Sequence, residues 1–425
     1  MKDKIYDIAV VGGGAAGMAA AITAARLNAD VIVLEKNDIV GKKLLSTGNG
    51  RCNFTNRLIG VGQYFSDDKK RLAPLLSAYG TSEAVRFFGE LGMISRENKD
   101  GGYYPYSNKA KDVRACFDTA LRQAGVSVAF SASVRKVVAE DGDFMITVAA
   151  MPEGNKAKVR AKSCILATGG MAAPKSGSTG DGYYYAKCFG HTTIEPHPAL
   201  VGLLCEKKEL VKLSGLRARA GVSLLLNGAA VRKEYGEVQF NRDGLSGIPV
   251  MSLSRLATDG RNTKKSVEIS LDLFPPGLEP DDSPELLMDL FYKKGEGKSI
   301  LEVLTGLLTE ELSLAVLSVS RLKADAAAKD VTDTELFRLH SVMSDMRFPV
   351  TGAKGFASAQ VTAGGVPLSE VDMITFASLK QNGLYLCGEL LDVDGICGGY
   401  NLHFAWASGQ AAGRAAAKKV KEVHG

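Results

Sequence analysis

The sequence predicts an α/β fold in which one domain, built from both ends of the chain, is interrupted by an inserted β-rich and helical region. Three observations carry this prediction. The first forty residues read as strand, glycine turn, helix and strand; apolar strands that end in glycine turns return near residues 170 and 388; and the residues between differ in composition. The expected parts are a split domain of residues 1–191 and 346–425, a β-rich insert of residues 192–280 and a helical subdomain of residues 281–345.

The N-terminal strand and turn have the spacing of a dinucleotide-binding motif. The Val/Ile run "YDIAVVG" is typical of a strand buried on both faces, and Gly12, Gly14 and Gly17 follow it with G-x-G-x-x-G spacing. Gly12 allows a tight turn, Gly14 lets a pyrophosphate approach the backbone, and Gly17 permits close helix packing. The Ala-rich helical segment "MAAAITAARLNA" leads to a second strand, "DVIVLEK", which ends at Glu35, where a carboxylate can accept both ribose hydroxyls. A glycine turn with a chance acid is the alternative, and the strand–turn–helix–strand context disfavours it.

The segment "LSTGNGRCNFTN" at residues 45–56 is unusually polar and rich in glycine. A simple nicotinamide-binding unit would continue promptly with a helix and strand, whereas this long stretch can line a ligand longer than adenosine. We therefore expect it to pass along the ribityl and isoalloxazine end of a flavin; a plain surface loop of turn-forming residues is the alternative. Arg51 and Asn53 are candidates to hydrogen-bond the flavin or a substrate carboxylate, while Cys52 is expected to be a small buried packing residue rather than a nucleophile.

Five parts of the chain resemble the BaiN/YhiN-like FAD-dependent oxidoreductases, which include aminoacetone-oxidase-type flavoproteins and belong to the glutathione-reductase-like superfamily. The resemblance covers essentially the whole chain, and the first segment alone is common to many dinucleotide-binding proteins. The segments are "VVGGGAAGMAAA" (10–21), "VGKKLLSTGNGRCNFTN" (40–56), "ATGGMAAPKSGSTGDGYYYAKCFGH" (167–191), "GEVQFNRDGLSG" (236–247), and "VTAGGV" (361–366) with "GLYLCGELLDVDGICGGYNLHFAWASGQAAG" (383–413).

The resemblance implies a Rossmann-like FAD-binding domain of the glutathione-reductase type. It implies that Glu389 hydrogen-bonds the ribityl chain, and that the helix starting at Gly398 to Asn401 directs its N–H dipoles at the pyrimidine edge of the flavin, which stabilises negative charge there. Motif and resemblance together assign to FAD binding Gly12, Gly14, Ala15, Ala16, Gly17, Glu35, Lys36, Lys43, Ser46, Gly48, Arg51, Cys52, Asn53, Val134, Thr168, Gly169, Gly170, Gly388, Glu389, Gly398, Gly399, Tyr400, Asn401 and Leu402.

Arg51, Tyr400 and His403 are the candidate catalytic residues. Tyr400 and His403 stand near the expected flavin-facing helix start as possible proton donors or substrate contacts; for His403 the alternative is a packed helix residue. The chain departs from the family pattern at Cys397 and His403, where threonine and glutamine are common, and at "AA" in residues 172–173, where serine or tyrosine is usual. These positions are expected to border the substrate cavity, so no family member's substrate carries over directly.

The composition limits the other possible partners and sites. A net charge of +5 without a dense Lys/Arg block disfavours nucleic acid as a partner. Seven scattered cysteines without a C-x-x-C pair argue against a zinc site, "HTTIEPH" at residues 191–197 reads as a linker, and no metal is expected. The start resembles a signal peptide, but Asp7 and four glycines fit one poorly. We expect a cytoplasmic monomer or small homo-oligomer, without membrane attachment, that acts on a small molecule.

The leading functional hypothesis is an FAD-dependent oxidoreductase that reduces a conjugated C=C bond in an enone or a steroid such as a bile acid. The flavin would carry the redox chemistry, and a nearby Arg51 would stabilise a developing enolate. No second G-x-G-x-x-G follows a strand, so no dedicated nicotinamide domain is expected, and NADH or NADPH would act as a transient reductant. The alternatives are an aminoacetone-type amine oxidase that uses oxygen and a flavin-binding protein without catalytic activity. The tyrosine segment "GGYYPYS" (101–107) either walls a hydrophobic substrate pocket or caps a hairpin.

Overall fold

The computed structural model describes residues 4–149, 156–275 and 285–424, and the chain forms two compact units. The first unit comprises Met1–Ala199 and Phe356–Gly425, and the second comprises Leu200–Gly355. The two boundaries between the units, at residues 199/200 and 355/356, differ from the expected boundaries at 191/192 and 345/346. The difference arises because strand pairing decides which unit a segment joins. Strand β11 (Ile194–Ala199) pairs with β18 (Val361–Gly365) in the first unit, whereas β17 (Met346–Ala353) pairs with strands of the second. The expected limit at residues 280 and 281 lies outside the described residues.

The centre of the first unit is a twisted, mostly parallel sheet in the order β7-β2-β1-β10-β9-β8, with β19 paired to β10. Strand β1 runs parallel to β2 and β10, and β9 and β8 form an antiparallel extension. The continuous Val/Ile runs at β1 and β2 are buried, as expected for strands covered on both faces. The strands are β1 (Ile5–Val11), β2 (Val31–Leu34), β7 (Ser127–Ala129), β8 (Ser133–Glu140), β9 (Asp143–Ala149), β10 (Lys156–Leu166) and β19 (Leu384–Leu386).

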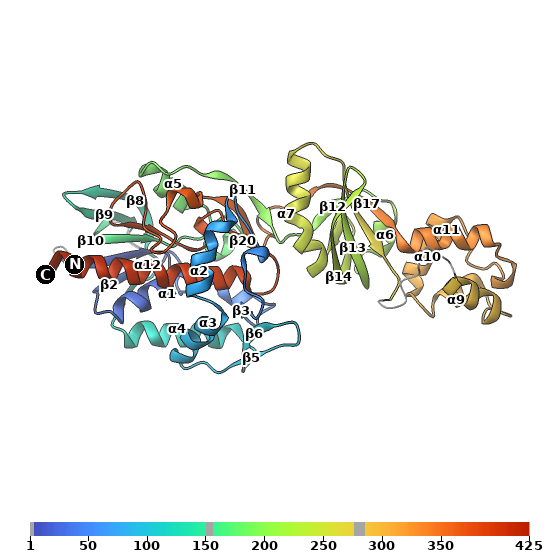
Figure 1. Ribbon diagram of the computed structural model, residues 1–425, viewed down its shortest axis with the longest axis horizontal. Helices are drawn as coiled ribbons and strands as arrows, with labels where there is room; N and C mark the ends of the chain where they lie inside the picture. The colour runs from blue at the N-terminus through green and yellow to red at the C-terminus, as the bar shows by residue number, and fades with distance from the viewer. Residues whose placement is uncertain (1–3, 150–155, 276–284, 425) are drawn as a thin grey trace. The chain divides into compact units, whose positions relative to one another are not determined.

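Two helices from opposite ends of the chain lie side by side on this sheet: α1 (Ala15–Ala25) and α12 (Tyr400–His424), as Figure 1 shows. A Cβ on Gly409 would lie 2.3 Å from the carbonyl oxygen of Ala16, and a Cβ on Gly413 would lie 2.2 Å from that of Ala20. The two backbones therefore approach closely at positions where no side chain larger than glycine's fits. This contact explains why the C-terminal segment completes the N-terminal domain.

Smaller strands and helices complete the first unit. A three-stranded sheet in the order β3-β6-β5 carries the tyrosine segment, and β4 pairs with β20. These elements are β3 (Thr55–Asn56), β4 (Tyr64–Phe65), β5 (Ser95–Glu97), β6 (Gly102–Pro105), β20 (Asp394–Gly395), α2 (Ala73–Ala78), α3 (Thr81–Glu90), α4 (Ala110–Gln123) and α5 (Asp181–Cys188).

The second unit is an antiparallel closed barrel in the order β12-β15-β14-β13-β16-β17, with its own hydrophobic core. Its strands are β12 (Leu203–Cys205), β13 (Arg217–Leu226), β14 (Ala229–Asn241), β15 (Gly244–Ser246), β16 (Val267–Asp272) and β17. Its helices are α6 (Glu209–Leu213), α7 (Ile248–Asn262), α8 (Glu285–Met288), α9 (Ile300–Leu304), α10 (Glu310–Ser320) and α11 (Asp333–Ser344). Capping boxes start α9 and α11, which is a sequence-encoded helix signal.

Candidate functional site

The three motif glycines between β1 and α1 have different surroundings: Gly12 and Gly17 lie against backbone, and Gly14 borders open space. A Cβ on Gly12, whose φ is +104°, would lie 2.6 Å from the carbonyl oxygen of Ala167, and a Cβ on Gly17 would lie 1.9 Å from that of Gly12. A Cβ on Gly14 would meet nothing within 4 Å. Gly14 is also the N-cap of α1 and supplies no side-chain cap. The space beside Gly14, at the uncapped start of α1, is therefore open, which fits an anion such as a pyrophosphate.

Glu35 lies where β2 ends and is almost fully buried, with 6% of its surface exposed. Its Oε2 accepts a hydrogen bond from the Gly13 backbone at 2.7 Å, and its Oε1 accepts from the backbone of Asn37 at 2.8 Å. Oε1 also accepts from the side-chain amide of Asn37 at 2.7 Å, so Oε2 is the oxygen that keeps a further lone pair, which leaves capacity for a ribose hydroxyl. Lys36 points elsewhere, because its ammonium forms an ion pair with Asp181 at 2.7 Å.

The segment after β10 lies against the first glycine turn. A Cβ on Gly12 would lie 3.1 Å from the Cα of Thr168, and Gly169 has a φ of +72°. A Cβ on Gly170 would lie 2.4 Å from Thr362 Oγ1, so this turn also needs glycine. Val134 is buried in β8, and its carbonyl accepts a hydrogen bond from a tyrosine hydroxyl at 2.7 Å.

A hydrogen-bond network joins four segments of the chain at the expected flavin end. Glu389 Oε2 accepts from Lys43 Nζ at 2.7 Å, and Glu389 Oε1 accepts from the Thr362 backbone at 2.7 Å. The hydroxyl oxygen of Thr362 in turn accepts from the backbones of Met171 and Ala172, at 2.7 and 2.9 Å. Thr362 is fully buried. Sequence reasoning missed its role, because nothing in "VTAGGV" indicates which distant amides the hydroxyl reaches.

The loop at residues 46–53 is held in shape by left-handed backbone and local hydrogen bonds. Gly48 has a φ of +56°, Cys52 has a φ of +59°, and Ser46 donates from its hydroxyl to the Lys43 carbonyl. Burial raises the pKa of Cys52 to about 12, so the thiol stays protonated and packs as expected. Arg51 donates to the Gly48 carbonyl, and its guanidinium lies 5.2 Å from the centre of the Tyr104 ring.

Asn53 supplies an unsatisfied buried acceptor at the same place. Within the described chain its Oδ1 is buried without a hydrogen-bond partner. A Cβ on Gly399 would lie 2.7 Å from this oxygen, and a Cβ on Gly102 would lie 2.8 Å from Asn53 Nδ2. A buried acceptor left without a donor costs about 1–3 kcal/mol, so this atom fits a donor from a bound group. With the open helix start at Gly14, it shows that these residues suit a dinucleotide cofactor.

The start of α12 is fixed by glycines and by side-chain bonds to the preceding turn. Gly398 and Gly399 have φ values of +131° and +94°. Asn401 accepts from the backbone N–H of Gly395 and donates to its carbonyl, both at 2.8 Å, so both ends of its amide are occupied. Tyr400 is 5% exposed.

Two further predicted contacts border this region. Leu402 is half-buried in the first turn of α12. Gly388 packs against Ala16, since a Cβ there would lie 2.8 Å from that side chain.

Of the two readings of His403, a proton donor or a packed helix residue, the structure supports the packed residue. It is 1% exposed, its Nε2 donates to the Tyr79 carbonyl at 2.8 Å, and its Nδ1 then accepts from the Thr55 hydroxyl at 2.8 Å. Burial, partly offset by the bond to the Tyr79 carbonyl, lowers the pKa of His403 to about 4. Both ring nitrogens are used in the protein interior, so His403 braces α12 and cannot act as a substrate-facing proton donor.

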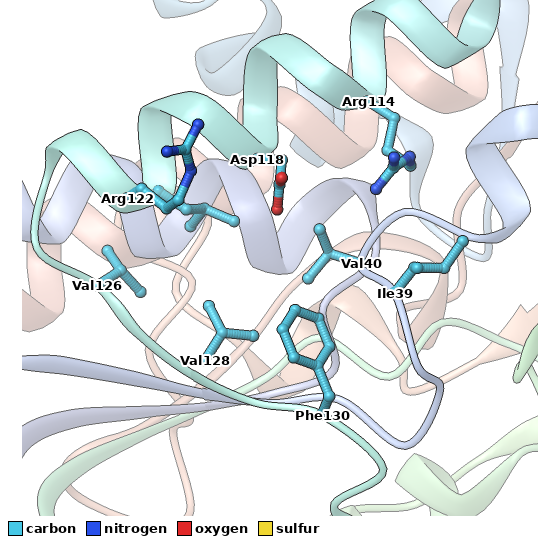
Figure 2. A pocket seen from close by; sticks show the side chains of 9 residues that line it. Ile39, Val40, Arg114, Asp118, Arg122, Val126, Val128 and Phe130 are labelled. Carbon is cyan, nitrogen blue, oxygen red and sulfur yellow. The ribbon is translucent and has the colours of Figure 1, made fainter.

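A separate hollow of about 420 Å³ lies between α4 and the β7 edge of the sheet. Figure 2 shows Arg114 and Asp118 pointing from α4 toward the loop that carries Val40, with Val128 and Phe130 opposite. None of its lining residues belongs to the set predicted to bind the cofactor. Within the described part of the chain, no group of three or more His, Cys, Asp or Glu side chains is arranged to hold a metal ion, and no helix could span a membrane.

Comparison with known proteins places the chain among flavoproteins. Residues 6–415 match the family described as HI0933-like protein Rossmann domain. The chain is similar to the 3-dehydro-bile acid delta(4,6)-reductase of Clostridium scindens. The two are 36% identical over 415 residues, which cover 97% of this chain and 99% of the reductase. It is also similar to the ribosomal RNA dihydrouridine synthase of Haemophilus influenzae. These two are 26% identical over 404 residues, which cover 95% of this chain and 96% of the synthase.

Solved structures support the fold. A flavocytochrome c3 fumarate reductase aligns over 99% of this chain and 79% of its own, with a TM-score of 0.52 and 17% identity. The 3-ketosteroid-delta4-(5alpha)-dehydrogenase of Rhodococcus jostii aligns over 98% of both chains, with a TM-score of 0.50 and 16% identity. The predicted α/β Rossmann-like fold with an inserted β region is thereby confirmed. The chain belongs to the HI0933-like family of FAD-dependent oxidoreductases, as the resemblance to BaiN/YhiN-like proteins predicted.

Proposed function

We propose that the protein reduces a C=C bond conjugated with a carbonyl group in a small apolar substrate such as a steroid. The observation that carries this proposal is the 36% identity, over 97% of the chain, to a 3-dehydro-bile acid delta(4,6)-reductase. The more distant dihydrouridine synthases fit the same reaction class, because the bond saturated in dihydrouridine is conjugated with a uracil carbonyl. Bound FAD would take electrons from NADH or NADPH and pass them to the substrate as a hydride equivalent.

The residues proposed to hold FAD come from both ends of the first unit. Gly14 and the start of α1 would face the pyrophosphate, and Oε2 of Glu35 would accept from a ribose hydroxyl. Lys43 and Glu389 form an ion pair at 2.7 Å where the ribityl chain is expected, and Asn53 offers an acceptor without a donor.

Arg51 is proposed to stabilise the negative charge that develops on the substrate carbonyl oxygen. Its Nε is tied to the Gly48 carbonyl at 3.2 Å and its guanidinium stacks over Tyr104, so the cation is held before any substrate arrives. A preorganised donor of this kind lowers the barrier more than a mobile one. Enone reduction also needs one proton. The phenol of Tyr400, whose pKa burial raises, is protonated at neutral pH and is the proposed donor in place of the buried His403.

Two alternatives are less well supported. An amine oxidase would bind its substrate beside Arg51, and a fixed cation opposes the protonated form of an amine. Action on RNA is suggested by the dihydrouridine synthases, but basic side chains of the barrel are paired with acids. Examples are the ion pairs Arg217–Glu237 at 3.0 Å, Arg232–Glu234 at 2.7 Å and Arg347–Asp345 at 2.7 Å. Such pairing favours a small molecule over a polyanion, and the expectation of no nucleic-acid partner stays a prediction.

Anaerobic reduction of the FAD-loaded protein with NADH or NADPH tests the proposal. The reduced protein is then mixed separately with a steroid enone, a uridine-containing oligonucleotide and oxygen, and flavin absorbance reports reoxidation. The oxidised protein is mixed with aminoacetone to test the oxidase alternative. We expect rapid reoxidation by the enone, slowed by Arg51→Met at unchanged FAD content, while Arg57→Met, at an exposed arginine, has no such effect. Full reductase activity of Arg51→Met would refute the role proposed for Arg51, and rapid amine oxidation without enone reduction would refute the reductase function.

A further inference from the structure

The hairpin formed by β5 and β6 has two chemically different faces. Arg96 pairs with Tyr104 across the hairpin, and Glu97 pairs with Tyr103. Side chains alternate along a strand and directly opposed residues share a face, so Arg96 and Tyr104 lie on one side and Glu97 and Tyr103 on the other. The Tyr106 backbone donates to the Ile94 carbonyl at 2.8 Å, which continues the pairing by one step. We call Ile94, Arg96, Tyr104 and Tyr106 the hairpin face.

The hairpin face exposes large apolar side chains that the opposite face does not. Ile94 is 75% exposed and Tyr106 is 72% exposed. On the opposite face, Tyr103 packs against the Phe54 ring at 6.4 Å between centroids and donates its hydroxyl to Glu97 at 2.9 Å. Adjacent exposed apolar side chains are typical of binding surfaces.

Two guanidinium groups flank Tyr104 on the hairpin face. Arg51 lies over the ring at 5.2 Å, and Arg96 is the cross-strand partner of Tyr104. In the described chain, Arg96 Nε is buried and has no hydrogen-bond partner. A buried N–H without an acceptor is costly, and guanidinium groups bind carboxylates with paired hydrogen bonds. Arg96 therefore lacks a hydrogen-bond acceptor on the hairpin face, and the carboxylate of a ligand can supply one.

We propose that the hairpin face selects substrates that combine a rigid apolar body with a carboxylate. Arg96 binds the carboxylate, Ile94 and Tyr106 contact the apolar body, and Arg51 is left for the substrate carbonyl. This inference rests on the proposed function, because it takes the loop that carries Arg51 as part of the substrate site. It names Arg96 as a specificity-determining residue that neither the sequence motifs nor the relatives indicate.

Single-stranded RNA is the competing occupant, since aromatic rings and arginines also bind unstacked bases. The hairpin favours the smaller ligand because Ile94, which is 75% exposed, offers an aliphatic surface without a plane on which a base can stack.

The test compares a steroid enone that carries a carboxylate with the same steroid as its carboxamide. Dissociation constants are measured by calorimetry on the oxidised FAD-loaded protein, and turnover is measured in parallel. The wild type is expected to bind the acid at least tenfold more tightly than the amide. Arg96→Gln should reduce that ratio to below threefold. The matched control is Arg57→Gln, which removes an arginine that pairs with Glu97 at 3.0 Å on the opposite face.

An unchanged ratio in Arg96→Gln, or a wild type that does not distinguish the two steroids, overturns the inference. Tighter Arg96-dependent binding of a uridine-containing single strand also overturns it. Arg96-dependent preference for the acid without turnover of either enone refutes the reductase proposal and leaves the inference standing. Turnover of both enones without preference refutes the inference and leaves the reductase proposal standing.

Discussion

Lowering the pH from 7 to 5 should destabilise the first unit through His403. This side chain is 1% exposed, accepts from the Thr55 hydroxyl and donates to the Tyr79 carbonyl, so the neutral ring satisfies every partner. Protonation would place a positive charge in the interior. In the unfolded chain the same imidazole is hydrated and titrates at its ordinary pKa of about 6.5.

The size of the effect follows from the pKa difference between the folded and unfolded states. Burial lowers the pKa of His403 to about 4, so between pH 4 and pH 6.5 the unfolded chain binds more protons than the folded one. Stability is therefore fully present above pH 6.5 and is lost as the pH falls toward 4. Linkage gives a loss of about 2 kcal/mol between pH 7 and pH 5, and about 3 kcal/mol in the acid limit.

Urea denaturation followed by tryptophan fluorescence measures this loss. Trp406 is the one tryptophan of the chain and lies in α12, where its Nε1 donates to the Phe54 carbonyl at 3.1 Å, so its emission reports the first unit. His403→Gln is the matched variant, because glutamine can keep both hydrogen bonds without titrating. At equal FAD occupancy, the wild type should lose about 2 kcal/mol more than the variant between pH 7 and pH 5. Equal losses would refute the assignment of a buried neutral His403.

Two further experiments test the cofactor site, and a third tests the burial of Cys52. Glu35→Ala should weaken FAD binding by roughly 1–3 kcal/mol, measured by FAD titration; unchanged affinity would place the ribose elsewhere. Gly14→Ala should fold normally, since its Cβ meets nothing, yet lose FAD affinity, whereas Gly17→Ala should lower the melting temperature of the protein even without FAD. Equal melting temperatures for the two variants would contradict these separate roles. Maleimide should label the exposed Cys188 and spare the buried Cys52 in the native protein, which mass spectrometry of peptides checks.

Structural features that depend only on residues close together in the chain could be predicted from the sequence. The strand ending at Val11, the turn at Gly12 to Gly17 and the acid at Glu35 lie within a short stretch, and backbone sterics alone restrict which residues fit there. Family-specific segments extended this prediction to a split flavin-binding domain. The domain limits were less accurate, because β17 is assigned to its unit by pairing with β12 and β16 rather than by composition.

By itself, the sequence determined the α/β fold class and the family of FAD-dependent oxidoreductases. Only the tertiary structure decided what the individual polar side chains do, because that depends on partners brought from far along the chain. Thr55 and Tyr79 lie 348 and 324 residues from His403, and together they turn an apparent proton donor into a buried brace. Similarly, Glu389 accepts a hydrogen bond from Lys43, which lies 346 residues away in the sequence. Local sequence fixes backbone conformation, whereas burial and charge are set by which distant segments pack together.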